Sequence, residues 1–237
     1  MKTIGLIGGM SWESTVTYYQ VINETIREKL GGLHSAKLLM YSVDFDEIER
    51  CQSSGDWDRS ADILADAAKR LERAGADFIV ICTNTMHKVA PEVRASVTIP
   101  LLHIAEVTAR KLKEAGITTV GLLGTCYTMT QPFYRDVLTQ AGIDVLVPEG
   151  ESIRTVNDII FNELCVGIVR DSSKETLLSA IHQLQSRGAQ GVILGCTELG
   201  LSVGEEDVDL PLFDTALIHA REAALEALSQ KNDGGRK

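Results

Sequence analysis

The sequence of 237 residues has no long apolar run, no Cys-x-x-Cys pair and no excess of basic residues. No apolar run approaches the roughly 20 residues of a membrane-spanning helix, and the N-terminus does not resemble a secretory signal. The formal net charge is −10, whereas nucleic acids and anionic membrane surfaces bind basic proteins. We therefore expect neither nucleic acid nor membrane as a partner.

The cysteines are too few and too scattered for a disulfide framework or a zinc site. They are odd in number and widely spaced: Cys51, Cys82, Cys126, Cys165 and Cys196. Such a pattern predicts reduced thiols, which is typical of the cytoplasm. We expect no bound metal, because Cys82 and His87 have no second pair of ligands to complete a site.

Short apolar segments alternate with amphipathic ones along the chain. The apolar segments predict strands over residues 3–7, 37–42, 77–81, 100–104, 119–123, 143–147, 191–194 and around 210–213. The amphipathic segments predict helices over residues 12–30, 48–52, 56–74, 88–96, 106–115, 127–140, 156–164, 174–187 and 217–228. This alternation is typical of an α/β protein with mostly parallel sheets flanked by helices.

The second half of the sequence repeats the first. TVGLLGT repeats TIGLIGG, GAQGVILGCT repeats GADFIVICTN, and LPLFDTA repeats IPLLHIA, at offsets of 116, 113 and 111 residues (121 − 5, 188 − 75 and 210 − 99). We interpret this as an internal duplication that gives two pseudo-symmetric domains, 1–105 plus 217–237 and 106–216. Because ligands bind at the carboxyl ends of parallel strands, we expect the active site in the cleft between the domains.

A glycine corner ends the first predicted strand. Gly8 and Gly9 are followed by Met10 and by Ser11, which is a suitable N-cap for the next helix. Such a corner can hold an anion, because N–H groups at a helix start point towards it. The glycine spacing differs from the GxGxxG dinucleotide fingerprint, so a nucleotide cofactor is not expected.

Cys196 is the strongest candidate for a catalytic residue. It follows a buried strand, and N–H groups at a helix start would lower the pKa of its thiol and make it a usable base. The alternative is a small buried side chain. Counting back 113 residues places Thr83 opposite it (196 − 113 = 83). Because side chains alternate along a strand, Thr83 should face the cleft and Cys82 the core.

The other candidates are polar or lie in the same loops. Those for substrate contacts are Met10, Ser11, Gln52, Asn84, Thr85, Thr125, Arg154, Thr197 and Glu198. The threonines and Asn84 suit a carboxylate, or else form turns and caps. Gln52 and Arg154 are candidates for the substrate side chain, although a surface position is favoured for both.

The histidines are less informative. His87 fits a catalytic or a structural role equally well, and His103 and Asp214 either interact or mark helix entries. His34, His182 and His219 are expected on the surface or on helix faces.

These motifs together resemble the aspartate/glutamate racemase family of cofactor-independent amino-acid racemases. The resemblance covers nearly the whole chain, in order, through IGLIGGMSWEST, CTNTMH, VGLLGT, GCTE and LPLFDTA. It implies two pseudo-symmetric α/β domains, a small acidic amino acid as substrate, no pyridoxal phosphate or other cofactor, and a homodimer. It also implies two bases, a cysteine thiolate that takes the Cα proton from one face and a cysteine thiol that protonates the other.

The match to the family's site residues is incomplete. The second family cysteine matches Cys196, but the first, directly before Asn-Thr, is replaced by Thr83. The residues that match α-carboxylate ligands of the family are Asn84, Thr85, Thr125 and Thr197. The basic residues for the distal carboxylate have no clear match, since YSVDF lacks an arginine and Arg154 is displaced.

The replacement of the first family cysteine by Thr83 leaves three alternatives for the function. A threonine hydroxyl is a much poorer base than a thiolate, which predicts an asymmetric racemase that prefers the L-enantiomer, with Thr83 acting directly or through water or His87. One-cysteine relatives that decarboxylate malonate-type acids need only a single thiol. A non-catalytic amino-acid-binding protein would need none.

Overall fold

The computed structural model describes residues 1–229, so the last part of the predicted first domain, 230–237, lies outside the described residues. The chain forms two compact units. The first unit contains Met1–Cys82, Val89–His103 and the chain from His219 on, and the second contains Thr83–Lys88 and Ile104–Ile218. The loop Thr83–Lys88 therefore groups with the second unit, whereas the sequence-based boundary leaves it in the first.

The first unit contains a four-stranded parallel sheet in the order β2-β1-β3-β4. Its strands are β1 (Ile4–Gly8), β2 (Leu38–Ser42), β3 (Phe78–Ile81) and β4 (Leu101–Leu102). Its helices are α1 (Trp12–Leu30), α2 (Phe45–Ser54), α3 (Trp57–Arg73), α4 (Ala90–Ser96) and most of α10 (Thr215–Leu228). The two central strands, β1 and β3, are buried along their whole length, as expected of parallel strands covered on both faces.

The second unit repeats this architecture with a parallel sheet in the order β6-β5-β7-β8. Its strands are β5 (Thr119–Gly124), β6 (Asp144–Leu146), β7 (Val192–Gly195) and β8 (Leu212–Asp214). Its helices are α5 (Ile104–Glu114), α6 (Cys126–Thr130), α7 (Pro132–Gln140), α8 (Glu151–Asn162) and α9 (Asp171–Ser186). It also contains most of the 3₁₀ turn η1 (Thr85–Val89) and the 3₁₀ turns η2 (Leu164–Val166), η3 (Leu199–Leu201) and η4 (Glu205–Asp207).

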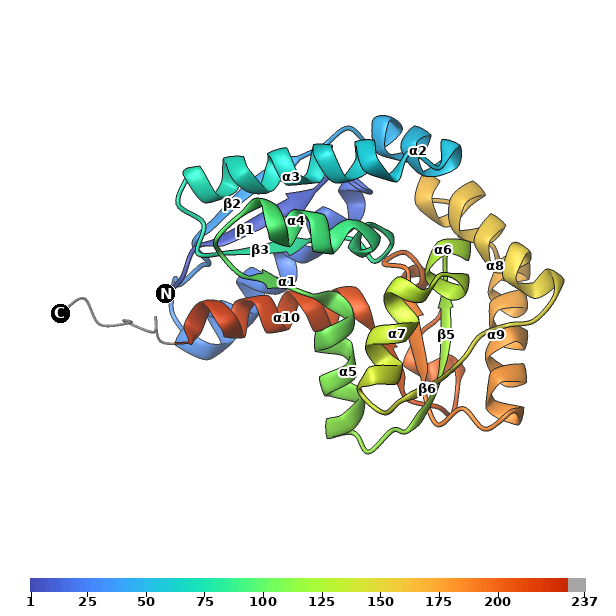
Figure 1. The fold of residues 1–237 in the computed structure, drawn as a ribbon. Helices are drawn as coiled ribbons and strands as arrows, with labels where there is room; N and C mark the ends of the chain where they lie inside the picture. The colour runs from blue at the N-terminus through green and yellow to red at the C-terminus, as the bar shows by residue number, and fades with distance from the viewer. Residues whose placement is uncertain (230–237) are drawn as a thin grey trace. The chain divides into compact units, whose positions relative to one another are not determined.

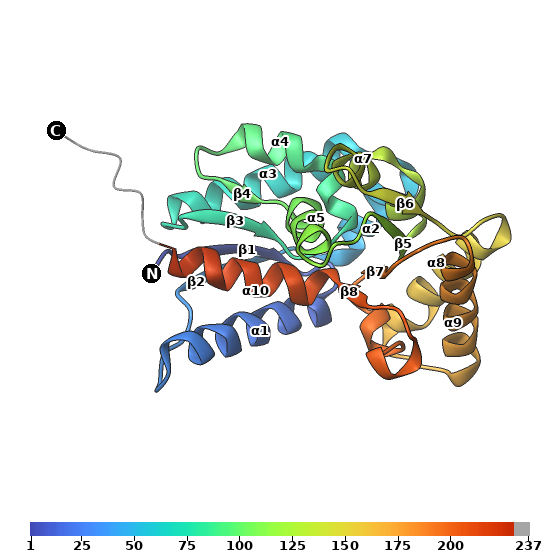
Figure 2. The same cartoon turned by 90° about the horizontal axis from the view of Figure 1, so that it is seen from below.

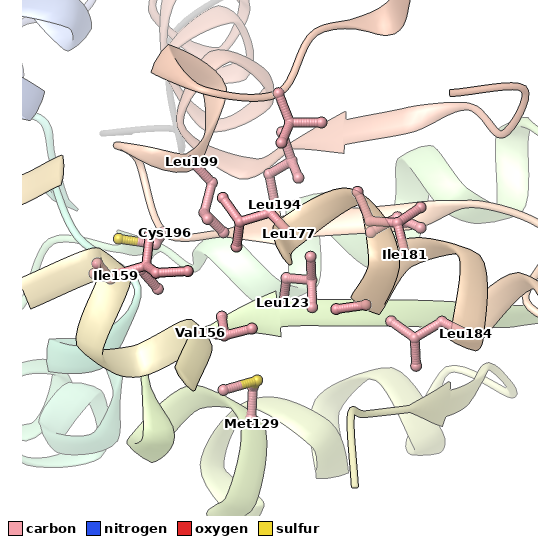
Figure 3. Close-up of a cluster of buried hydrophobic side chains, with 14 of the residues drawn as sticks. Leu123, Met129, Val156, Ile159, Leu177, Ile181, Leu184, Leu194, Cys196 and Leu199 are labelled. Carbon is pink, nitrogen blue, oxygen red and sulfur yellow. The ribbon is translucent and has the colours of Figure 1, made fainter. Parts of the chain in front are cut away.

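In the second unit α7 and α9 lie on opposite sides of β5 (Figure 1), and apolar side chains pack on both faces of the sheet. Leu122 and Ile193 face α5 and α7, whereas Leu123 and Leu194 face α8 and α9. This alternation follows the two-residue period of a strand, and it explains why both central strands are continuously apolar. Cys196 lies at one end of the α8–α9 cluster, beside Ile159 (Figure 3).

The strand register of the two units confirms the internal duplication. Ile7 pairs with Ile81 in the first sheet, and Leu123 pairs with Leu194 in the second. Leu123 is the counterpart of Ile7 (7 + 116 = 123), so Leu194 is the counterpart of Ile81. Two residues further along each strand, Thr83 and Cys196 occupy equivalent positions.

Two helix predictions differ from the structure for local reasons. The helix predicted over 127–140 is divided into α6 and α7 at Gln131, which is extended (ψ 151°) because it precedes Pro132. The helix predicted from Val156 begins at Glu151 instead. Its first turn, ESIR, has one apolar residue, Ile153, so it lacks the apolar periodicity that marks the rest.

His219 lies on α10 but is buried, which corrects the surface alternative; His34 and His182 are exposed as predicted. In the first unit α1 and α10 lie side by side (Figure 2), and Tyr18 Oη is 2.8 Å from His219 Nδ1. His219 Nε2 lies 3.0 Å from the Leu102 carbonyl oxygen. Because a carbonyl only accepts, Nε2 donates. Burial lowers the pKa of His219, so the ring is neutral and Nδ1 accepts from Tyr18.

We expect His219 to make the protein sensitive to mild acid. Burial lowers the pKa of His219 from 6.5 to about 3. The unfolded chain therefore takes up a proton near pH 6.5 that the folded chain refuses, so stability falls as the pH falls from 6.5, by up to about 1.4 kcal/mol per pH unit. Urea unfolding of wild type and His219→Gln between pH 7 and 5 tests this. The variant should be less stable at pH 7 and lose less on acidification, whereas His34→Gln should behave as wild type; equal slopes would contradict the assignment.

Candidate active site

The candidate site of the second unit forms where β5 and β7 end side by side. Gly124 pairs with Gly195, and Thr125 and Cys196 follow directly. A Cβ atom on Gly195 would lie 2.9 Å from the Leu123 carbonyl oxygen, and one on Gly124 would lie 3.0 Å from the Gly195 carbonyl oxygen. These glycines therefore allow the close approach of the two strand ends, which are the carboxyl ends where parallel sheets bind ligands.

The Cys196 thiol and the Glu198 carboxylate form a hydrogen-bonded pair. Cys196 Sγ donates to Glu198 Oε2 at 3.0 Å, and Thr197 Oγ1 donates to the same oxygen at 2.6 Å. Cys196 and Glu198 are both buried, at 8% and 5% exposure. A buried carboxylate is costly unless it is hydrogen-bonded, and these donors supply part of that compensation.

The pKa of the Cys196 thiol is raised well above its ordinary value, which is the opposite of the lowering expected from a helix start. The hydrogen bond with Cys165 is the largest cause, followed by burial and by the negative charge of Glu198. Cys196 is followed by a 3₁₀ turn, η3, rather than a long helix, so the helix dipole that would lower the pKa is weak. The resting site therefore holds a protonated thiol.

Cys165 is the site neighbour that sequence reasoning missed. It lies in η2 and packs against the same apolar cluster as Cys196. No motif surrounds it, and it precedes Cys196 by 31 residues (196 − 165), so no sequence signal connects the two thiols. Only the fold of the second unit brings them together.

Three threonine hydroxyl groups form a row at the end of β5, the strand that lies beside β7. Thr85 Oγ1 is 3.1 Å from Thr125 Oγ1, which is 3.2 Å from Thr128 Oγ1. Thr125 also caps α6 by accepting from the Thr128 backbone N–H. The structure thus brings together Thr85 and Thr125, two of the candidates for carboxylate binding, and the capping alternative also holds for Thr125.

Asn84 has an open acceptor inside the second unit. Its Nδ2 donates to Thr215 Oγ1 at 2.9 Å, and Thr215 in turn donates to the Leu194 carbonyl oxygen at 2.9 Å. Asn84 Oδ1 is buried without a hydrogen-bond partner in the described residues. A buried acceptor without a partner is costly, so it indicates a ligand or water that donates to it.

His87 has a structural role in the loop Thr83–Lys88. Its Nδ1 lies 2.8 Å from the Thr83 carbonyl oxygen, and its Nε2 accepts from the Ile104 backbone N–H at 3.2 Å. Both ring nitrogens are therefore used to fasten the loop to the start of α5. Thr83 itself is half-buried, whereas Cys82 is fully buried, as the alternation along the strand predicts.

The remaining candidates belong to the first unit, are exposed or serve other contacts. In the first unit, Met10 is buried, Ser11 caps α1 by accepting from the Ser14 backbone N–H, and Gln52 is buried in α2, which corrects its expected surface position. Arg154 is exposed on α8. Asp214 accepts from the N–H groups of Ala216 and Leu217, so it marks the entry of α10.

Two kinds of feature are absent from the part of the chain that the structure describes. Between residues 1 and 229, no three His, Cys, Asp or Glu side chains are grouped so that they could hold a metal ion. Within the same range no helix combines the length and the apolar character needed to cross a bilayer.

The chain matches known proteins along most of its length. The model of the Asp/Glu/hydantoin racemase family matches residues 7–223. A structure of a candidate Asp/Glu racemase from Yersinia pestis is 52% identical, covers 97% of this chain and 100% of its own, and superposes with a TM-score of 0.92. An aspartate racemase homologue from Pyrococcus horikoshii OT3 is 40% identical over 97% of this chain and 100% of its own, with a TM-score of 0.85. The broad specificity amino-acid racemase RacX of Bacillus subtilis is 23% identical over 92% of this chain and 95% of its own.

Proposed function

Because the chain belongs to the Asp/Glu/hydantoin racemase family and is a cofactor-independent amino-acid racemase, we propose that it racemises aspartate and glutamate, with Cys196 as the base and Thr83 on the opposite face of the substrate. The observation that carries the proposal is the hydrogen-bonded thiol of Cys196 at the strand edge that also presents Thr125. A thiol that exchanges its proton with Cα is the central requirement of racemisation without a cofactor.

Polar atoms of the second unit suit the α-carboxylate and the α-ammonium group of an amino acid. The hydroxyls of Thr85 and Thr125 suit the α-carboxylate, because each can donate a hydrogen bond to an oxygen. The unpartnered Oδ1 of Asn84 suits the α-ammonium, because it accepts only. Asn84 therefore has a proposed role different from the carboxylate contact inferred from the sequence. Candidates from the first unit, Met10, Ser11 and Gln52, and Arg154 on α8 remain proposals for the rest of the substrate.

The two faces of the substrate should differ in reactivity. Cys196 and Thr83 occupy equivalent strand positions in the two sheets, yet one is a thiol and the other a hydroxyl. A hydroxyl can donate a proton but is a poor base near neutral pH, so deprotonation by Thr83 is slow. We propose that Cys196 removes the Cα proton of the L-enantiomer and that the L-substrates exchange this proton with solvent faster. Since His87 is engaged at both ring nitrogens, water is the favoured relay to Thr83.

The experiment that tests this function is solvent exchange at Cα. L- and D-aspartate and L- and D-glutamate are incubated separately with the protein in D₂O, and deuterium and chirality are followed by NMR and chiral chromatography. We expect deuterium at Cα with both L-substrates, faster than with the D-substrates. Equal rates would contradict the asymmetry, and no deuterium in any of the four would contradict action on acidic amino acids.

Decarboxylation of a malonate-type acid is the second candidate function. One observation favours it: the raised pKa of Cys196 keeps the thiol protonated, and loss of CO₂ leaves an enolate that a single thiol can protonate. Incubation with a 2-substituted malonate would release CO₂ if this candidate were correct. A non-catalytic binding protein would show neither CO₂ nor exchange, and would bind aspartate unchanged after Cys196→Ala.

We also propose a homodimer that uses the outer face of α1. Trp12, Val16 and Tyr19 are exposed there with helical spacing, and Leu33 protrudes fully exposed beyond the end of the helix. Val16, Tyr19 and Leu33 rim a hollow of about 620 Å³ that also contains Glu24 and Arg27. An exposed apolar side chain beside a hollow that contains an acidic and a basic residue suits a two-fold symmetric interface. In such an interface the same surface of each copy contacts the other copy.

Light scattering after size exclusion tests the dimer. Leu33→Asp should shift the wild-type dimer towards monomer, because it places a charge in the proposed contact. Leu201→Asp, a change at an exposed leucine of the second unit, is the matched control and should leave the dimer intact. A wild-type monomer, or a dimer that tolerates Leu33→Asp, would contradict the proposal.

The cytoplasm is the proposed location. All five cysteines are free and none forms a disulfide. Free thiols at the reaction centre require reducing surroundings, since oxidation of Cys196 would remove the acid and base.

A further inference from the structure

Glu198 makes contacts that a substrate ligand does not need. Its Oε2 accepts hydrogen bonds from Cys196 Sγ at 3.0 Å and from Thr197 Oγ1 at 2.6 Å, and the residue is 5% exposed. The first contact directs the carboxylate towards the sulfur, and the second holds that oxygen in place. Because the carboxylate already accepts a hydrogen bond from the thiol, it is placed to take the thiol proton itself.

We propose that Glu198 is a positioning residue that takes the thiol proton of Cys196 when the sulfur acts as base, and that it therefore makes a buried thiol competent near neutral pH. This inference rests on the proposed function and deepens it. It gives Glu198 a role different from the substrate contact inferred from the sequence.

The proton balance of the step is complete. In the resting pair the proton is on Sγ and the charge on the carboxylate. The proton moves to Oε2, and the thiolate then takes the Cα proton of the substrate and leaves its electron pair on the carbanion. A donor on the opposite face protonates the carbanion, and the Glu198 carboxylic acid returns its proton through solvent to that donor. The pair carries one negative charge before and after the internal transfer.

The surroundings of Cys196 explain why such a partner is needed. Val156 and Ile159 of α8 and Leu199 of η3 belong to the same apolar cluster (Figure 3), and η2 contributes the second thiol, Cys165. Loss of the thiol proton to solvent would leave a thiolate 3.0 Å from the Glu198 carboxylate in this buried site. Transfer within the pair avoids two adjacent negative charges, because the carboxylate becomes neutral as the sulfur becomes charged.

The test uses two measurements that should move in opposite directions. Glu198→Gln keeps the size and an acceptor oxygen but removes the charge and the basicity. Iodoacetamide alkylation of Cys196, located by peptide mass spectrometry, should become about tenfold faster at fixed pH for each unit by which the thiol pKa falls. Exchange of the Cα proton of L-aspartate in D₂O should become roughly 10²-fold slower in kcat, because the acceptor of the Cys196 thiol proton is lost.

Further variants separate this role from a structural one. Glu198→Asp keeps the carboxylate and should restore part of the exchange, with a pH profile closer to wild type than that of Glu198→Gln. Glu205→Gln, a change at an exposed glutamate of η4, should alter neither measurement. Circular dichroism and thermal unfolding establish that each variant is folded.

Each outcome decides the proposal. Faster alkylation together with slower exchange supports it. Faster alkylation together with faster exchange would show that the thiolate alone is the base, and a raised KM with unchanged kcat would return Glu198 to substrate binding; both overturn it. Equal alkylation rates overturn the coupling of thiol and carboxylate even if wild type shows no exchange. No exchange in wild type with faster alkylation of Glu198→Gln would reject the racemase and retain the pair.

Discussion

Replacement of Cys196 by alanine should lower the rate of Cα proton exchange of L-aspartate by roughly 10²–10⁴-fold, the usual contribution of a general acid or base. Alanine keeps a small apolar side chain beside Ile159 and Leu199 and leaves the Glu198 carboxylate without its thiol donor. The loss should therefore appear in kcat, while the KM changes little. Deuterium incorporation followed by NMR measures the effect directly.

A second thiol provides the matched control. Cys82→Ala removes a cysteine that is fully buried, and burial raises its thiol pKa far above the ordinary range. We expect this variant to keep exchange within a few-fold of wild type, apart from a modest loss of stability from the small cavity. Strong loss of activity in Cys82→Ala, with Cys196→Ala still active, would mean that Cys82 is the base and that the assignment of Thr83 to this position is wrong.

The fold was predictable because its signals are local and repeated. Four apolar segments in each half, each followed by an amphipathic segment, leave few choices other than parallel sheets flanked by helices. The offset between the halves then fixes the counterpart of every strand. Ile81 and Leu194 hold equivalent positions in their sheets, and Thr83 and Cys196 each follow two residues later.

The chemistry of the site was less predictable because it depends on neighbours distant in sequence. Placing Cys196 at a strand end suggested a lowered pKa, but Cys165, burial and Glu198 raise it. Cys165 belongs to a 3₁₀ turn in a segment without a motif. The sequence also gives no direction for the Glu198 side chain, which can point to a substrate or to the thiol two residues earlier.

Burial of polar residues was the other property hidden from pattern reasoning. His219 lies on a helix whose apolar residues surround nearly its whole circumference, so no polar face marks which positions are exposed. Gln52 belongs to a short helix with many charged residues and was expected at the surface, yet its side chain is buried. In both cases packing against other elements decides whether the side chain is buried. The periodicity of a single helix does not predict this packing.

Thr83→Cys should increase the rate of Cα proton exchange of D-aspartate by roughly 10²-fold, because it replaces a hydroxyl with a thiol that can serve as a base. Thr83 is half-buried and lies two residues beyond Ile81, the counterpart of Leu194, so a cysteine there occupies the position equivalent to Cys196. The hydrogen bond between His87 and residue 83 involves the backbone carbonyl and should persist. Exchange from D- and L-aspartate, measured separately in D₂O, gives the ratio of the two faces.

The ratio of the exchange rates of L- and D-aspartate is more informative than either rate alone. In wild type the L-substrate is expected to exchange faster, and in Thr83→Cys the two rates should approach each other, since each face then has a thiol. Thr83→Ser retains the hydroxyl and should keep the wild-type ratio, which controls for changes in packing. If Thr83→Cys leaves the ratio unchanged while a thiol reagent modifies the new cysteine, the side chain of residue 83 does not reach Cα and the proton on that face comes from water. Combined with Cys196→Ala, the same substitution should reverse the preference, because only the face of residue 83 would then have a thiol base.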